Sequence, residues 1–114
     1  MINEKIENYF GSSSSEFDHY FGNKIGLTRF YIESNKKNPN INIEEICHKN
    51  LRDFISGLKG ILEKIEVGQI QEDSKINKNF ISEFILLAES IIDPTDENQI
   101  NKLYEQYHKL SQKG

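Results

Sequence analysis

The stretch NIEEICHKNLRDFISGLKGILEKIEVG, residues 42–68, decides the fold of this chain. Its apolar residues recur at alternating steps of four and three, which is the spacing of one face of an α-helix. This stripe consists of Cys47, Leu51, Phe54, Leu58, Ile61 and Ile65. Asn42 with Glu45 fits a capping box at the start, and Gly68 fits a C-terminal cap. The pattern predicts one long helix over residues 43–67.

Two further helices are predicted after this one. From Ser74 onward a second stripe is formed by Ile76, Phe80, Phe84, Leu87 and Ile91, and it is widened by Ile81, Ile85, Ala88 and Ile92. So wide an apolar arc predicts a central helix that contacts two neighbours. We expect it to end at Asp93-Pro94, because proline disfavours helix at the residue before it. Residues 96–111 carry the narrow stripe of a surface helix, formed by Ile100, Leu103, Tyr104, Tyr107 and Leu110.

The N-terminal third is less clearly patterned. A short helix fits Ile2, Ile6, Tyr9 and Phe10, and the serines at 12–15 fit either a linker or an ordered helix cap. Residues 22–34 fit helix or strand. We favour helix, because a lone strand would leave its backbone groups unpaired. The chain is therefore predicted to be all-α, a bundle of four to five helices in a single domain spanning residues 1–114.

Composition excludes several classes of function. The formal charge of -4 and the pI near 5.4 argue against a nucleic-acid binder, which needs cations on phosphates. The longest apolar run, Phe84 to Ala88, is too short to span a membrane, and the start MINEKIENYF lacks the apolar core of a signal peptide. One cysteine allows no internal disulfide. We expect a cytoplasmic protein that contacts neither nucleic acid nor membrane.

Three Glu-x-x-His pairs resemble the ligand pattern of di-iron helical bundles. They are Glu16 with His19, Glu45 with His48, and Glu105 with His108. On a helical wheel at least one member of every pair points away from the apolar stripe, whereas ligands of a core metal must point inward. The pairs are therefore interpreted as surface residues, and no metal site or cofactor is predicted.

No catalytic residues are predicted, so we expect a protein that is not an enzyme. Cys47 and His48 diverge by about 100° on a helix, so they do not form a nucleophile–base pair, and Cys47 lies in the core stripe. The Gly57-Leu58-Lys59-Gly60 stretch matches the short clamp of some RNA-binding modules. Because Leu58 belongs to the apolar stripe, a close approach of two helices explains these glycines better.

Negative charge is concentrated in residues 63–97, which hold nine acidic residues and three lysines. The window carries a net charge of -6 and the rest of the chain +2. One interpretation is a solvated face with acids at helix starts, where the helix dipole favours them. The other is a surface for a basic partner, in which Leu86 sits among acids. The candidate partner-binding residues are Glu63, Glu66, Glu72, Asp73, Glu83, Leu86, Glu89, Asp93, Asp96 and Glu97.

In size, acidity and helical pattern the chain resembles the cytosolic immunity proteins that bacteria pair with secreted nuclease toxins of colicin or contact-dependent growth-inhibition type. The resemblance implies a non-enzymatic inhibitor that covers a basic toxin domain with the acids of residues 63–97. One alternative is a helical adaptor or small structural subunit, using a helical groove or dimerising through the aromatic N-terminal third. Another is a phage-type inhibitor that mimics the charge of nucleic acid.

Overall fold

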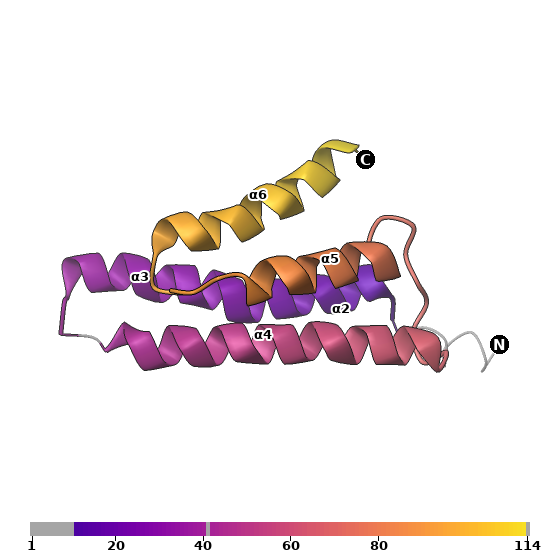
Figure 1. Cartoon of the computed structure of the whole chain (residues 1–114), viewed down its shortest axis with the longest axis horizontal. Coiled ribbons are helices and arrows are strands. Elements are labelled where there is room, and N and C mark those ends of the chain that lie inside the picture. The colour runs from indigo at the N-terminus through magenta and orange to yellow at the C-terminus, as the bar shows by residue number, and fades with distance from the viewer. Residues whose placement is uncertain (1–10, 41, 114) are drawn as a thin grey trace.

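The computed structural model describes residues 11–40 and 42–113, and within these ranges the chain forms four helices and no strand. The first helix is a continuous run of α2 (Ser13–Tyr20), the π-helical segment η1 (Phe21–Gly26) and α3 (Leu27–Lys37). It is followed by α4 (Ile43–Glu66), α5 (Lys78–Glu89) and α6 (Glu97–Lys113). The all-α prediction is confirmed, with four helices, and the ambiguous residues 22–34 are helical (Figure 1). The short helix predicted around Ile2 and Phe10 falls outside the described residues.

The serine run is an ordered helix cap and not a linker. Ser12 is the N-cap residue of α2, and its Oγ accepts a hydrogen bond from the amide of Ser15 at 3.2 Å. Ser13 is fully buried, and its Oγ donates to the carbonyl of Ile76 at 2.5 Å and accepts from the amide of Asp73 at 2.7 Å. This buried hydroxyl both donates and accepts a hydrogen bond, and it thereby connects the start of α2 to the loop that precedes α5.

The long helix α4 is confirmed, with its predicted stripe buried from Cys47 to Ile61. The predicted capping box is wrong: Asn42 is the N-cap residue, but its side chain makes no capping hydrogen bond. The C-terminal cap is correct. Gly68 has φ +79°, its amide donates to Ile65, and the amide of Gln69 donates to the Lys64 carbonyl at 2.8 Å. These two bonds are the Schellman motif, which favours glycine at the left-handed position.

Helix α5 contacts two neighbours, α4 and α6, as predicted, but it is shorter than predicted at both ends. It begins after Asn77, whose Oδ1 accepts from the amide of Phe80 at 2.9 Å, so the start predicted near Ser74 is wrong. It ends at Glu89, well before Pro94. The side chain of Gln99 accepts hydrogen bonds from the amides that follow the helix, including that of Ile92. Ile92 lies beyond the end of α5 and is 86% exposed, so its predicted place in the apolar stripe is wrong.

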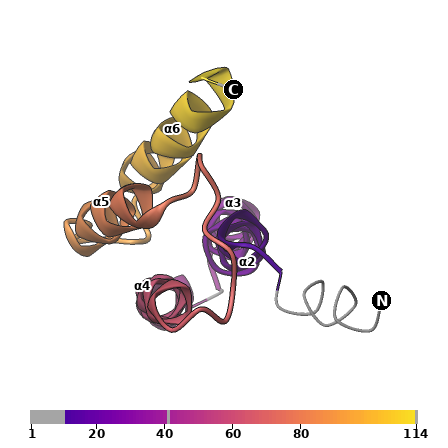
Figure 2. The ribbon, with the colours of Figure 1, turned by 90° about the vertical axis from the view of Figure 1, so that its right-hand side faces the viewer.

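The helices pack side by side around an aromatic core centred on Phe17, Phe54 and Phe84, all fully buried (Figures 1 and 2). Helix α4 runs antiparallel to the first helix on one side and to α5 on the other. Gly57 lies at a close contact between α4 and α2, because a Cβ there would come within 2.6 Å of the Tyr20 ring. The close-approach interpretation is therefore confirmed for Gly57 and wrong for Gly60, where a Cβ would meet no described heavy atom within 4 Å.

Helix α6 is the surface helix predicted for residues 96–111, and it is anchored at its start. Ile100 and Leu103 are fully buried, whereas Tyr104, Tyr107 and Leu110 are half-buried. From this anchored end α6 diverges from α5 toward the C-terminus, as both views show (Figures 1 and 2). Among the helices described, none has an apolar stretch long enough to cross a membrane.

Candidate functional site

The ten candidate partner-binding residues do not form one surface. Helix α5 separates the acids of the loop before it from those of the turn after it (Figure 1). Its 12 residues span about 18 Å at the rise of an α-helix. The candidates therefore divide into four places. These are the paired outer faces of α4 and α5 (Glu63, Glu66, Leu86, Glu89), the loop before α5 (Glu72, Asp73), a groove between α5 and α6 (Glu83), and the turn before α6 (Asp93, Asp96, Glu97).

The outer faces of α4 and α5 are aligned by an ion pair between Lys59 and Glu89, with Nζ and Oε2 3.4 Å apart. The two helices are antiparallel neighbours, so residues at equal distances from this pair lie opposite each other. Glu63 is one turn beyond Lys59, or about 6 Å, and Leu86 lies about 4.5 Å before Glu89. Glu63 and Leu86 are therefore at nearly the same level on adjacent helices. We call the surface formed by Lys59, Glu63, Glu66, Ser82, Leu86 and Glu89 the α4–α5 face.

Leu86 is the apolar centre of the α4–α5 face and is 67% exposed, since it lies on the side of α5 opposite the buried stripe. Glu63 and Glu66 are exposed, and neither forms an ion pair with any residue that the structure describes. The lysine between them, Lys64, is turned toward α2, where its Nζ lies 2.9 Å from Glu16. The face therefore combines an exposed leucine with carboxylates that no described side chain neutralises. An apolar centre with a charged rim is the usual arrangement of a protein interface.

The two acids of the loop before α5 have structural partners. The Oε2 of Glu72 accepts from the amide of Lys78 at 2.7 Å, which satisfies a backbone donor in the first turn of α5. The Oδ1 of Asp73 accepts from the amide of Lys75 at 2.8 Å, and this bond holds the pKa of the Asp73 carboxyl below its ordinary value. These carboxylates act mainly on the chain itself, as the helix-start interpretation expects.

The acids of the turn before α6 are likewise engaged. Asp93 accepts hydrogen bonds from the hydroxyl and the amide of Thr95, and these bonds lower the pKa of its carboxyl. Glu97 pairs with Lys36 at 2.8 Å, and the same contact lowers the pKa of Glu97. Asp96 accepts from the amide of Asn98 and stabilises the first turn of α6. This group supports the fold at the end of the molecule opposite the loop before α5 (Figure 1).

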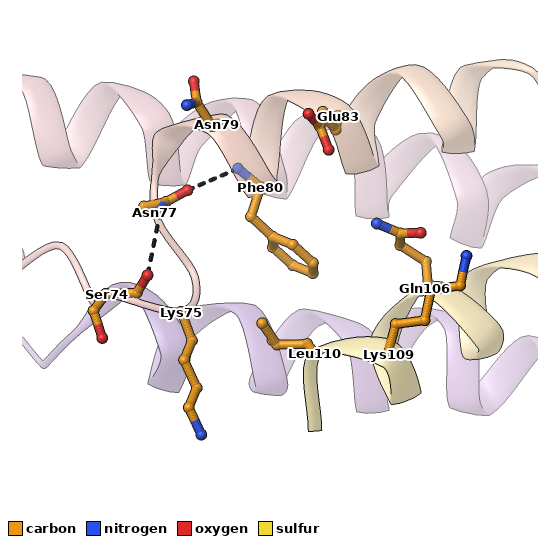
Figure 3. Close-up of a pocket in the computed structure, with 9 residues that line it drawn as sticks. All are labelled: Ser74, Lys75, Asn77, Asn79, Phe80, Glu83, Gln106, Lys109 and Leu110. Atoms are coloured by element: carbon orange, nitrogen blue, oxygen red, sulfur yellow. Dashed lines mark hydrogen bonds between the residues drawn. The ribbon is translucent and has the colours of Figure 1, made fainter. Parts of the chain in front are cut away.

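Glu83 lines a groove of about 630 Å³ between α5 and α6 that the sequence patterns did not reveal (Figure 3). Its walls are formed by Ser74, Lys75, Asn77, Asn79, Phe80, Glu83, Gln106, Lys109 and Leu110. A second hollow of about 240 Å³ lies on the α2 side of α6, and Lys75 and Leu110 line both. Phe80 and Leu110 lie in the apolar stripes that the sequence shows, but the structure leaves both only half-buried, and this outcome could not be read from the sequence.

Cys47 and the histidines occupy the positions expected of core and surface residues. Cys47 is fully buried, and burial raises the pKa of its thiol to about 11, so it is protonated at neutral pH. His19, His48 and His108 are exposed. Within the described ranges, the structure brings together no group of three or more potential metal ligands. Comparison with protein-family models, with curated proteins and with solved structures finds no match to this chain.

Proposed function

We propose that this chain is a non-enzymatic binding protein, an immunity protein that neutralises a basic, nuclease-type toxin domain through its α4–α5 face. The observation that carries the proposal is Leu86, which is 67% exposed and lies at nearly the same level as the exposed Glu63 on the neighbouring helix. A leucine that becomes fully buried in an interface contributes about 1.5–3 kcal/mol. Exposed carboxylates around it favour a partner whose surface is cationic.

The division of the acids sharpens the proposal. Glu72, Asp73, Asp93 and Glu97 hold helix starts or ion pairs, so reversing them would act mainly through stability. Glu63 and Glu66 neither cap a helix start nor form an ion pair with any described residue. We therefore assign the attraction of a basic partner to these two, with Glu89 held by Lys59 at the edge of the face. Charges of this kind raise the association rate more than they slow dissociation.

The first test is whether a neighbouring gene encodes a toxic protein with a basic C-terminal domain. The second is co-expression with that domain, scored as survival and as affinity of the purified pair. Glu63→Lys with Glu66→Lys is expected to slow association and to remove protection, and Leu86→Ala is expected to speed dissociation. The matched control is Glu45→Lys with Glu105→Lys, which makes the same charge change at exposed positions outside the face. Each variant is checked by thermal unfolding. Equal behaviour of the two charge-reversed pairs, both folded, contradicts the proposal.

The α5–α6 groove favours a second candidate, the helical adaptor. A groove of about 630 Å³ with half-buried Phe80 and Leu110 in its walls is of the size that accepts a partner's side chains. An adaptor would bind through this groove and would tolerate reversal of Glu63 and Glu66. Loss of binding on Phe80→Ser but not on Glu63→Lys would therefore favour the adaptor over the immunity protein.

A further inference from the structure

Helix α6 lies between the first helix and α5. Along its C-terminal half, the structure shows it packed on the first helix but not on α5. Its aromatic residues lie against the first helix. The Tyr107 ring stacks on Phe21 with centroids 4.6 Å apart, and its hydroxyl donates to Asp18. Arg29 lies over the Tyr104 ring, 4.6 Å from its centroid. On the other side, toward α5, the groove is open (Figure 3).

The two walls of this groove are complementary to each other. Phe80 and Glu83 project from α5, and Leu110 and Lys109 project from α6 on the opposite side (Figure 3). Because α5 and α6 run in opposite directions, closing the groove would bring Phe80 toward Leu110 and Glu83 toward Lys109. Neither Glu83 nor Lys109 has an ion-pair partner among the described residues. Closure would thus bury two half-exposed apolar side chains and pair two charges.

A pivot for such a movement exists at the start of α6. Ile100 and Leu103 are fully buried, and Glu97 is held by Lys36. Leu110 is ten residues beyond Ile100, so the helix forms a lever of about 15 Å from its buried anchor. A small rotation at the anchor therefore moves Leu110 by several ångströms. Such a rotation would have to break the Tyr107–Asp18 hydrogen bond and shift the Tyr107 ring on Phe21.

We infer that α6 is a two-position helix that gates the groove, pivoting on its buried first turns. In the open position, which this structure shows, Tyr107 is bonded to Asp18 and the groove is accessible. In the closed position Leu110 packs on Phe80, Lys109 pairs with Glu83, and the groove is filled. This inference is independent of the proposed immunity function, because it concerns only residues of this chain that lie off the α4–α5 face.

The experiment measures the α5–α6 distance in the full chain by pulsed electron spin resonance. Spin labels are placed at Ser82→Cys and His108→Cys, both exposed and outside the groove lining. Cys47 is fully buried and stays unlabelled in the folded protein, which a chain without the added cysteines verifies. Two distance populations are expected, the shorter one corresponding to helices packed with axes about 8–10 Å apart. A Ser56→Cys, Ser82→Cys pair across α4 and α5 serves as the control and should give one distance.

Two substitutions should shift the populations in opposite directions. Tyr107→Phe keeps the ring but removes the hydrogen bond to Asp18, so the closed-to-open ratio should rise about 2- to 12-fold. Glu83→Gln removes the charge that Lys109 would meet, so the ratio should fall about 1.5- to 5-fold. A single Ser82–His108 distance that neither substitution moves overturns the inference. It is equally overturned if the control pair splits in the same way, because the motion would then not belong to α6.

Discussion

The two glycines of the Gly57-Leu58-Lys59-Gly60 stretch should respond in opposite ways to alanine. Both lie inside α4, where replacing glycine by alanine gains about 0.8–1 kcal/mol of intrinsic helix propensity. At Gly60 a Cβ would meet no described heavy atom within 4 Å, so Gly60→Ala should stabilise the protein by about that amount. At Gly57 the Cβ would lie 2.6–2.9 Å from three atoms of the Tyr20 ring. Either the ring or the helix must move.

Overpacking of this kind costs about 1–3 kcal/mol, which exceeds the propensity gain over most of its range. Gly57→Ala should therefore destabilise the protein by up to about 2 kcal/mol. The assay is urea unfolding followed by circular dichroism, with Tyr20→Ala and the double variant completing a mutant cycle. In the Tyr20→Ala background the ring is absent, so Gly57→Ala should become stabilising. If Gly57→Ala stabilises the native chain as much as Gly60→Ala does, the close contact between α2 and α4 does not exist as described.

Three other predictions follow from burial and charge. Leu86→Ala should cost less than about 1 kcal/mol of unfolding free energy and Phe84→Ala about 3–5 kcal/mol; equal losses in chemical denaturation would show that the outer face of α5 is misplaced. The Cys47 thiol, with its pKa raised to about 11, should resist thiol reagents at pH 8 until the protein is unfolded, and rapid labelling of the folded chain would contradict its burial. The carboxyl pKa values of Asp93 and Glu97 are lowered in the folded chain, so their stabilising contribution is present above the ordinary values of 3.8 and 4.5 and is lost as pH falls further. Thermal unfolding between pH 6 and pH 2.5 should show this loss, and Asp93→Asn should reduce it; an unchanged pH profile would refute the role of Asp93.

The boundaries of α5 show where local patterns cease to be sufficient. Ser74 and Asn77 both suit the N-cap position, and nothing in their immediate sequence chooses between them. The choice is made by a distant residue, since Ser13 binds the Ile76 carbonyl and the Asp73 amide and holds this segment outside the helix. At the other end, the side-chain oxygen of Gln99 in α6 accepts hydrogen bonds from the amides that follow α5. The Ser13 contacts join residues 63 and 60 positions apart, and the Gln99 contacts cross the turn between two helices, so the apolar pattern of a single helix contains neither.

The sequence predicted which kinds of residue form the candidate site, but not how they are arranged in space. The exposure of Leu86 follows from its angle on the α5 wheel, which depends on sequence spacing alone. The acidic window of residues 63–97, in contrast, is continuous only along the chain, because the length of α5 separates the loop before it from the turn after it by about 18 Å. Which acids remain without a described partner depends on which cations the other helices bring near. Lys36 reaches Glu97, and Lys64 turns away from Glu63 and Glu66 toward α2.

The sequence by itself determined the helical class, the long α4 with its buried stripe and glycine cap, and the inward position of Cys47. It could do so because each of these rests on the 3.6-residue repeat or on cap chemistry within a few residues. Only the tertiary structure decided the shortened α5, the division of the acids, and the groove beneath α6. Those features depend on the angles and registers at which helices pack. These are set by contacts between distant side chains, such as Tyr107 on Phe21, Lys59 with Glu89, and Gly57 against Tyr20.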